Sequence, residues 1–205
     1  MPPGELLVCA VGDSIVAGSP GWDPDPEVRA RIGAALDERS QWEHWAERAH
    51  PGVTFRNCGV YGERTDEIAL RLDACAAGAR ALIVQGGIND IAQRRSVETA
   101  AGNLRELVSR GKELGLPTAI ANVLPWNNGS PGAAAAIRRL NELIEELARA
   151  EGIRVLPFHQ TLEDPERPGR MHEGWTAEGD HPSIEGYRLL GERAFSPAKA
   201  WRGLR

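Results

Sequence analysis

Short and nearly continuous hydrophobic runs recur along the chain at the length of a β-strand. They cover residues 6–11, 53–55, 81–84, 118–123 and 153–158. Because apolar and polar residues do not alternate within these runs, we expect strands that are buried on both faces, as in a parallel sheet. The pattern therefore predicts five buried parallel strands.

The segments between the hydrophobic runs carry apolar residues at spacings of three and four, which is typical of amphipathic helices. The predicted helices cover residues 27–49, 65–77, 97–114, 132–151 and 182–195. Strands and helices thus alternate, and right-handed crossovers place the helices on both faces of the sheet. The chain has no internal repeat or long interior linker, so we expect one α/β domain over residues 1–205.

Composition and charge narrow the partners that we expect. The chain is 41% hydrophobic and 26% charged with a net charge of −5, and it has no basic run that predicts a nucleic-acid partner. No apolar run reaches the length of a membrane span, and the first residues lack the basic and apolar regions of a signal peptide. We therefore expect a cytoplasmic protein with neither a nucleic acid nor a membrane as partner. The sequence does not indicate an oligomeric state.

Several cofactor and metal sites are disfavoured by the absence of their motifs. The phosphate-loop, dinucleotide-binding and HExxH patterns do not occur, and the five histidines are scattered. The GxSxG motif of ordinary α/β-hydrolases is also missing. The three cysteines lack CxxC spacing, and we interpret them as free thiols. We therefore expect no cofactor and no metal ion.

Polar residues that suit acyl transfer follow the predicted strands. Such a reaction needs a hydroxyl, an imidazole base, a group that orients the base, and donors for an oxyanion. Ser14 supplies a hydroxyl after the first strand, and His181 supplies an imidazole before the last helix. Backbone N–H groups in the glycine turn at residues 59–62 and the side-chain amide of Asn89 are candidate donors. Ligands of parallel sheets bind beyond the carboxyl ends of the strands, so one crevice can hold all these groups.

Each of these residues also has a purely structural interpretation when it is taken alone. Ser14 is equally consistent with a helix N-cap, and Asn89 with an Asx turn. Asp13 we interpret as an acceptor for backbone N–H groups of its own turn.

The loop after the fourth predicted strand supplies candidates for the wall of a substrate pocket. These are Trp126 and Asn127, with Asn128 beside them.

Four motifs taken together resemble the sequence blocks of the SGNH, or GDSL-type, hydrolases, and they occur in that family's order. They are GDSI at residues 12–15, the Asn-x-Gly-x-x-Gly turn at 57–62, GIND at 87–90 and DHPS at 180–183. The resemblance implies a three-layer flavodoxin-like fold with a five-stranded parallel sheet and helices on both faces. It also implies ester hydrolysis without a cofactor.

The same resemblance implies a role for each matching residue. Ser14 is the nucleophile, and His181 is the general base. The backbone N–H groups of Ser14 and Gly62 and the side-chain amide of Asn89 form the oxyanion hole.

The chain departs from the family at the carboxylate, because the family usually has Asp three residues before the histidine. Here Glu178 occupies that position, and Asp180 is adjacent to His181. We favour Glu178, since a carboxylate at this spacing can reach Nδ1 across a turn. Asp180 and a backbone carbonyl remain alternatives.

The sequence thus predicts a serine esterase whose partner is a small-molecule ester with a short acyl group, such as an acetyl ester of a carbohydrate. A lysophospholipase or thioesterase is the alternative within the enzymes. A ligand-binding protein on the same fold, without catalysis, is the alternative outside them.

Overall fold

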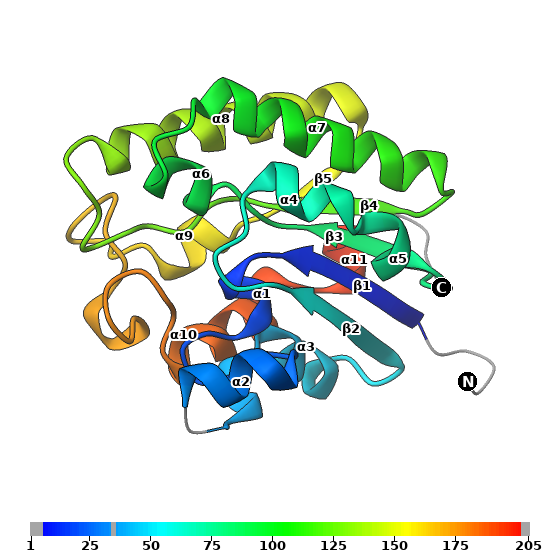
Figure 1. The fold of residues 1–205 in the computed structure, drawn as a ribbon, viewed down its shortest axis with the longest axis horizontal. Helices are drawn as coiled ribbons and strands as arrows, with labels where there is room; N and C mark the ends of the chain where they lie inside the picture. The colour runs from blue at the N-terminus through cyan, green and yellow to red at the C-terminus, as the bar shows by residue number, and fades with distance from the viewer. Residues whose placement is uncertain (1–5, 34–35, 202–205) are drawn as a thin grey trace.

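A computed structural model describes residues 6–33 and 36–201 of the chain. Its centre is a five-stranded parallel sheet in the order β2-β1-β3-β4-β5 (Figure 1). The strands are β1 (Leu6–Gly12), β2 (Val53–Gly59), β3 (Ala81–Val84), β4 (Thr118–Ala121) and β5 (Arg154–Leu156). This is the doubly wound order in which the chain reverses its direction across the sheet between β1 and β3. The fold class predicted from the hydrophobic runs is confirmed.

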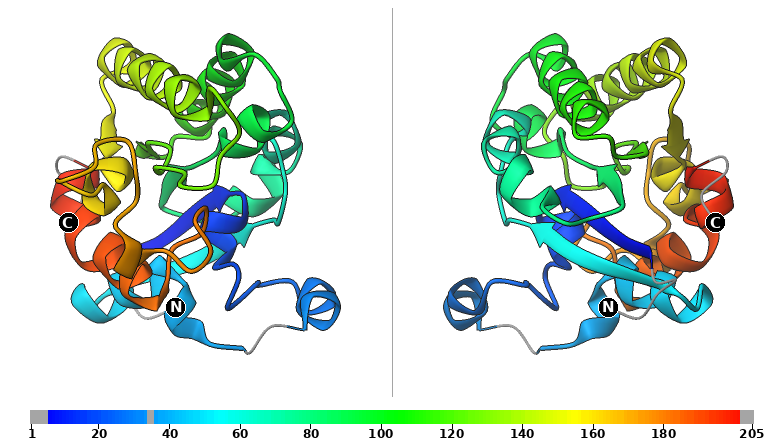
Figure 2. Two further views of the ribbon diagram at one scale, coloured as in Figure 1. Left: turned by 90° about the vertical axis from the view of Figure 1, so that its left-hand side faces the viewer. Right: turned by 90° about the vertical axis from the view of Figure 1, so that its right-hand side faces the viewer.

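One face of the sheet is covered by the helices between β2 and β5. They are α4 (Thr65–Leu70), α5 (Leu72–Ala76), α6 (Ile88–Ala92), α7 (Val97–Glu113) and α8 (Ala133–Glu151). Leu104 and Leu107 of α7 and Leu140 and Ile144 of α8 are fully buried against this face. The two long helices lie side by side over the sheet in both views of Figure 2.

The opposite face packs on α3 (Trp42–Ala49), α9 (Phe158–Leu162), α10 (Ile184–Leu189) and α11 (Pro197–Ala200). Trp42 is fully buried there, and its ring meets those of Phe55, Phe158 and Phe195 at centroid distances of 5.0 to 5.9 Å. Such tilted and edge-to-face aromatic pairs stabilise a core beyond the area that they bury. Trp42 therefore packs α3 against this face of the sheet.

The single helix predicted over residues 27–49 is wrong. The structure has α2 (Pro26–Ile32), a 3-10 turn (Glu38–Ser40) and α3 in its place. Gly33 ends α2 in the left-handed conformation, and the side chain of Asp37 caps the 3-10 turn. Residues 34–35, which fall inside the predicted helix, lie outside the described residues. In Figure 2, α2 extends away from the sheet and the other helices.

Two other predicted helices are also interrupted. The one at residues 65–77 is broken at Arg71 into α4 and α5. The last begins at Ile184, with Ser183 as its N-cap, and continues after α10 as a π-helical turn (Leu190–Ala194). Within residues 6–33 and 36–201, no helix is both long and apolar enough to cross a membrane.

A carboxyl group is buried between α3 and β2. Glu43 is 3% exposed, and its Oε1 accepts a hydrogen bond from Nδ2 of Asn57 at 3.2 Å. Its Oε2 is buried with no partner within residues 6–33 and 36–201. Burial raises the pKa of Glu43 well above its ordinary value of 4.5. The folded protein therefore keeps this proton at pH values where the unfolded chain has lost it.

We predict that Glu43→Gln flattens the pH dependence of stability. In the wild type the unfolded state binds fewer protons than the native state above pH 4.5, so the free energy of unfolding falls as the pH rises. One such group contributes a slope of up to about 1.4 kcal/mol per pH unit. Urea denaturation between about pH 5 and pH 8 measures this slope. The control is Glu146→Gln, which removes an exposed carboxyl group. A slope in Glu43→Gln equal to that of the wild type and of the control contradicts the prediction.

Candidate active site

Ser14 is the first residue of α1 (Ser14–Ala17), which begins directly after β1. Oδ1 of Asp13 accepts a hydrogen bond from the backbone N–H of Ile15 at 2.9 Å and so caps this helix. The expected role of Asp13 as a turn acceptor is confirmed. Asp13 is buried and also pairs with Gln85, and burial raises its pKa to about 6. Ser14 itself is 5% exposed.

Two glycines allow α1 to pack directly against the ends of the strands. A Cβ atom on Gly59 would lie 2.1 Å from the backbone nitrogen of Ala17. A Cβ atom on Gly12 would lie 2.4 Å from Cγ2 of Val16. Any larger residue at Gly59 must displace backbone atoms, and thus the first turn that carries Ser14.

A chain of hydrogen bonds runs from Ser14 through His181 to Glu178. The Oγ atom of Ser14 lies 2.9 Å from Nε2 of His181, and Nδ1 of the same ring lies 2.6 Å from Oε1 of Glu178. The arrangement is chemically consistent when Nδ1 carries the proton and donates to Glu178, because Nε2 then accepts from the Ser14 hydroxyl. Oδ1 of Asp180 is farther from Nδ1, at 3.4 Å.

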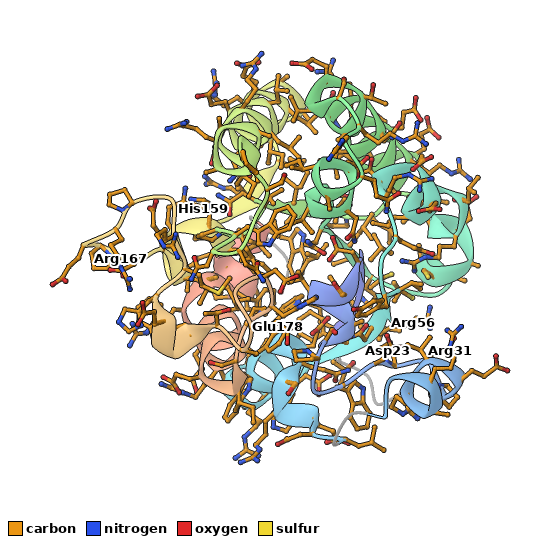
Figure 3. The ribbon with its side chains drawn as sticks, turned by 60° about the vertical axis from the view of Figure 1, so that its left-hand side comes forward. Asp23, Arg31, Arg56, His159, Arg167 and Glu178 are labelled. Atoms are coloured by element: carbon orange, nitrogen blue, oxygen red, sulfur yellow. The ribbon has the colours of Figure 1, made fainter. Side chains whose placement is uncertain are left out.

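A tight turn explains why the carboxylate three residues before the histidine reaches the ring. The backbone N–H of Ala177 donates to the carbonyl of His181 at 2.9 Å, which folds the segment back on itself. Gly179 has a φ of +108°, a conformation that favours glycine. In Figure 3 Glu178 lies beside the ribbon of α1.

The environment of His181 combines burial with two carboxylates. Burial by itself lowers the pKa of this imidazole, but the hydrogen bonds and charges of Asp180 and Glu178 outweigh it. The net effect raises the pKa of His181 above 6.5. Since a stronger base accepts a hydroxyl proton more readily, the ring is suited to general-base chemistry near neutral pH.

The candidate oxyanion donors lie around the same point. Gly62 is held in a left-handed turn with a φ of +78°, and Asn89 is on α6 after β3. Over the described parts of the chain, the backbone N–H groups of Ser14 and Gly62 have no protein acceptor. The Asn89 amide donates one hydrogen bond to the carbonyl of Glu63 at 2.9 Å and has a second N–H to offer.

A pocket of about 110 Å³ opens at Ser14. Its lining comes from the ends of several strands and the loops after them: Ser14, Ile15, Tyr61, Gly62, Ile88, Asn89, Ala92, Trp126, Asp180 and His181. The structure therefore brings together Ser14, Gly62, Asn89 and His181, which the sequence predicted to share one crevice.

Tyr61 is a pocket residue that sequence reasoning missed. Its ring is half exposed and is stacked on His181, with a centroid distance of 6.3 Å and an angle of 19°. Its position between Gly59 and Gly62, within a turn already identified as part of the site, was the signal that could have found it.

Trp126 lines the pocket as predicted, but the structure does not bring Asn127 to its wall. The side chain of Asn127 donates to the carbonyl of Met171 at 2.8 Å and accepts from the same residue's N–H at 2.7 Å. Asn128 accepts from Trp126 Nε1 and donates to the carbonyl of Glu178. These two asparagines thus join the loop after β4 to the segments around Met171 and Glu178.

Two larger cavities lie away from Ser14. One of about 520 Å³ lies between α7, α8 and Trp201, and one of about 410 Å³ lies beside His159 at α8 and α9. Ser14 and His181 line neither cavity, so the chemistry of the hydroxyl belongs to the small pocket.

Within the described residues, one group of side chains has potential metal-ligating atoms within 4.8 Å of one another. It consists of Glu178, Asp180 and His181. In this group both carboxylates approach Nδ1 of the ring, while Nε2 approaches Ser14. The geometry fits a carboxylate–imidazole–hydroxyl chain, in which the carboxylate orients the base.

The chain belongs to the GDSL-like lipase/acylhydrolase family, whose model matches residues 10–189. The matched range includes Ser14, Gly62, Asn89 and His181, so the resemblance stated from the sequence is confirmed at the level of the family. No curated protein is significantly similar to the chain.

Solved structures of GDSL proteins share the fold. A G-D-S-L family protein from Desulfitobacterium hafniense DCB-2 is 24% identical with a TM-score of 0.76, over 92% of this chain and 97% of that one. A lipolytic G-D-S-L family member from Veillonella parvula DSM 2008 is 21% identical with a TM-score of 0.71, over 91% and 94%. A catalytic mutant of an acetylxylan esterase from Geobacillus stearothermophilus is 16% identical with a TM-score of 0.68, over 95% and 93%.

We predict that Glu178→Ala lowers the rate of ester hydrolysis more than Asp180→Ala does. Glu178 holds Nδ1 at the shorter distance, so its loss frees the ring to rotate and exchange tautomers. The expected decreases in kcat are roughly 100-fold for Glu178→Ala and less than about tenfold for Asp180→Ala. Both changes lower the pKa of His181, so the acidic limb of the pH–rate profile moves to lower pH. A larger decrease for Asp180→Ala would assign the orienting role to Asp180.

Proposed function

We propose that this protein is a serine esterase that hydrolyses short-chain carboxylic esters through an acyl-enzyme on Ser14. The observation that carries this proposal is the hydrogen-bond chain from Ser14 through His181 to Glu178. A serine hydroxyl is a weak nucleophile unless an adjacent base removes its proton. This chain provides the base at hydrogen-bond distance and a carboxylate behind it.

Acylation begins when Nε2 of His181 takes the Ser14 proton while Oγ attacks the ester carbonyl. The negative charge that develops on the carbonyl oxygen is stabilised by the N–H groups of Ser14 and Gly62 and by the amide of Asn89. One such donor contributes about 3 kcal/mol to lowering the barrier. His181 then gives its proton to the departing alcohol oxygen, and the C–O bond breaks to leave the acyl group on Ser14.

Deacylation uses the same groups in the opposite direction. His181 takes a proton from water, and the resulting hydroxide attacks the acyl carbonyl within the same oxyanion hole. The carboxylic acid leaves when His181 returns the proton to Oγ of Ser14. No metal ion or nucleotide takes part in either half of the reaction.

The size of the pocket supports a small acyl group. About 110 Å³ accommodates an acetyl group, and the apolar side chains of Ile15, Ile88 and Ala92 line the space. A lysophospholipase needs room for a long acyl chain, and a thioesterase with coenzyme A as its leaving group needs contacts for several phosphates. These remain the second candidate activities.

The rim of the pocket supports a carbohydrate as the alcohol. Tyr61 and Trp126 present aromatic surface there, and Trp126 is fixed in orientation by its hydrogen bond to Asn128 at 2.6 Å. Rigid aromatic walls with a few polar groups suit a sugar ring. The acetylxylan esterases among the structural neighbours agree with this substrate class.

A ligand-binding protein without catalysis is the competing proposal from outside the enzymes. It accounts for the fold but gives no reason for the Ser14 hydroxyl to lie 2.9 Å from an imidazole that a carboxylate orients. The two proposals differ in one measurable respect, which is turnover that depends on Ser14.

We predict that Ser14→Ala lowers kcat/KM for p-nitrophenyl acetate by at least about 1000-fold, because no other group can form the acyl-enzyme. Release of p-nitrophenolate measures the rate. Ser130→Ala is a matched control, since Ser130 is exposed and does not line the pocket. Undiminished hydrolysis by Ser14→Ala would eliminate Ser14 as the nucleophile.

We also predict that kcat/KM falls as the acyl chain lengthens. A series of p-nitrophenyl acetate, butyrate and octanoate varies the acyl group and keeps the leaving group constant. Because a pocket of about 110 Å³ favours a small acyl group, octanoate should react at least about tenfold less efficiently than acetate. A maximum at octanoate would instead favour the lysophospholipase or thioesterase activity.

A further inference from the structure

One arginine outside the pocket makes hydrogen bonds to the ends of two strands and to the loop that carries Gly62. Arg71 lies at the break between α4 and α5, and its side chain is 21% exposed. Nη2 donates to the carbonyl of Gly12 at 2.8 Å, and Nη1 donates to the carbonyl of Cys58 at 2.5 Å. Nε donates to Oε2 of Glu63 at 2.7 Å. One planar guanidinium thus joins three separate segments.

Each of these three segments carries or adjoins a candidate oxyanion donor. Gly12 ends β1 two residues before Ser14, and Cys58 lies near the end of β2, before the turn that contains Gly62. Glu63 directly follows Gly62. The guanidinium therefore fixes the relative positions of the backbone on both sides of the oxyanion hole.

Glu63 extends this connection to the third donor. Its carboxylate pairs with Arg71, while its backbone carbonyl accepts the hydrogen bond from Nδ2 of Asn89 at 2.9 Å. That bond orients the amide whose other N–H is available to the pocket. Gly62 has a φ of +78°, and a Cβ atom added to it would meet no described atom within 4 Å. Its carbonyl accepts one long hydrogen bond, of 3.4 Å, from Nε2 of Gln93. The ion pair of the adjacent Glu63 with Arg71 adds a shorter and charged restraint to this turn.

We propose that Arg71 is a positioning residue that sets the geometry of the oxyanion hole through Glu63 and the ends of β1 and β2. The inference rests on the proposed function, because it concerns the donors that stabilise the oxyanion of that reaction. Arg71 touches neither the pocket nor His181. It acts on the donors and not on the base.

The geometry of the contacts requires an arginine. Its five N–H groups lie in one rigid plane and serve acceptors in three directions, whereas a lysine ammonium is a compact charge that cannot reach all three at once. Arg71→Lys therefore keeps the positive charge but loses part of the connection. A misplacement of catalytic groups by about 1 Å costs on the order of 100-fold in rate.

Arg56 on β2 offers a matched control. Its Nη1 donates to the carbonyls of Cys75 and Ala77 at 2.8 and 2.5 Å, so it too connects a strand to backbone carbonyls. It makes no contact with the pocket lining, and Figure 3 shows it on the far side of α1 from Glu178. Arg56→Lys removes a comparable structural contact without changing the oxyanion hole.

The experiment compares Arg71→Lys, Arg56→Lys, Ser14→Ala and the wild type in hydrolysis of p-nitrophenyl acetate over a range of pH. We expect Arg71→Lys to lower kcat by about 10- to 100-fold while KM changes less than about threefold. The apparent pKa of the acidic limb should stay at its wild-type value, since His181 keeps its partners. Arg56→Lys should keep kcat within about twofold, even if both lysine variants lose similar stability in urea.

Glu63→Gln provides a second variant in case Arg71→Lys does not fold. It leaves the bonds from Arg71 to the two carbonyls in place and weakens only the link to the Gly62 turn. We expect a decrease in kcat of about 3- to 10-fold. Where Arg71→Lys folds, the double variant Arg71→Lys/Glu63→Gln should lose less than the product of the two single effects, because both changes break the same connection.

The outcomes separate this inference from the proposed function. Equal hydrolysis by wild type and Ser14→Ala overturns the proposed function and the inference with it. Hydrolysis that depends on Ser14, with kcat retained in Arg71→Lys and Glu63→Gln, overturns the inference alone. A loss of kcat in Arg71→Lys that Arg56→Lys reproduces also overturns the inference. So does a loss of kcat in Arg71→Lys that is accompanied by a shift of the acidic limb of the pH–rate profile.

Discussion

The close approach of α1 to the ends of β1 and β2 is the steric constraint on which the site depends. It exists only because Gly12 and Gly59 have no Cβ atom: such an atom would lie 2.4 Å from Val16 at the first position and 2.1 Å from Ala17 at the second. The interior of a protein is too closely packed to absorb such overlaps without moving backbone. The first turn of α1 therefore has one position, and Ser14 is presented at the reversal point of the sheet, where parallel sheets bind ligands.

Hydrogen bonds orient the groups that the fold brings to this point. The turn before α10 directs Glu178 and His181 toward each other, and Asn128 of the loop after β4 holds the backbone of that turn. On the other side Arg71 and Glu63 link the strand ends to the turn of Gly62. The base and the oxyanion donors are thus supported by separate networks, which can be perturbed one at a time.

The sequence predicted the sheet and the main groups of the site because both follow from local patterns. Strands buried on both faces read as continuous apolar runs, and groups after parallel strands share one edge, which brought Ser14 and His181 to the same pocket. The spacing before the histidine also favoured Glu178, which the structure places nearest to Nδ1. Contacts between distant segments left no such pattern: the amide of Asn127 binds Met171 rather than lining the pocket, and Arg71 lies in no motif.

The central claim is that His181 activates Ser14 as a nucleophile, and covalent labelling tests it most directly. A fluorophosphonate reacts only with an activated serine and transfers its phosphonyl group to Oγ with loss of fluoride. Intact-protein mass spectrometry followed by peptide mapping reports the number and the position of the adducts. The account predicts one adduct on Ser14 and none in Ser14→Ala, with labelling of His181→Ala strongly slowed. Absence of an adduct on Ser14 in the folded wild type, or labelling that does not depend on His181, would contradict it.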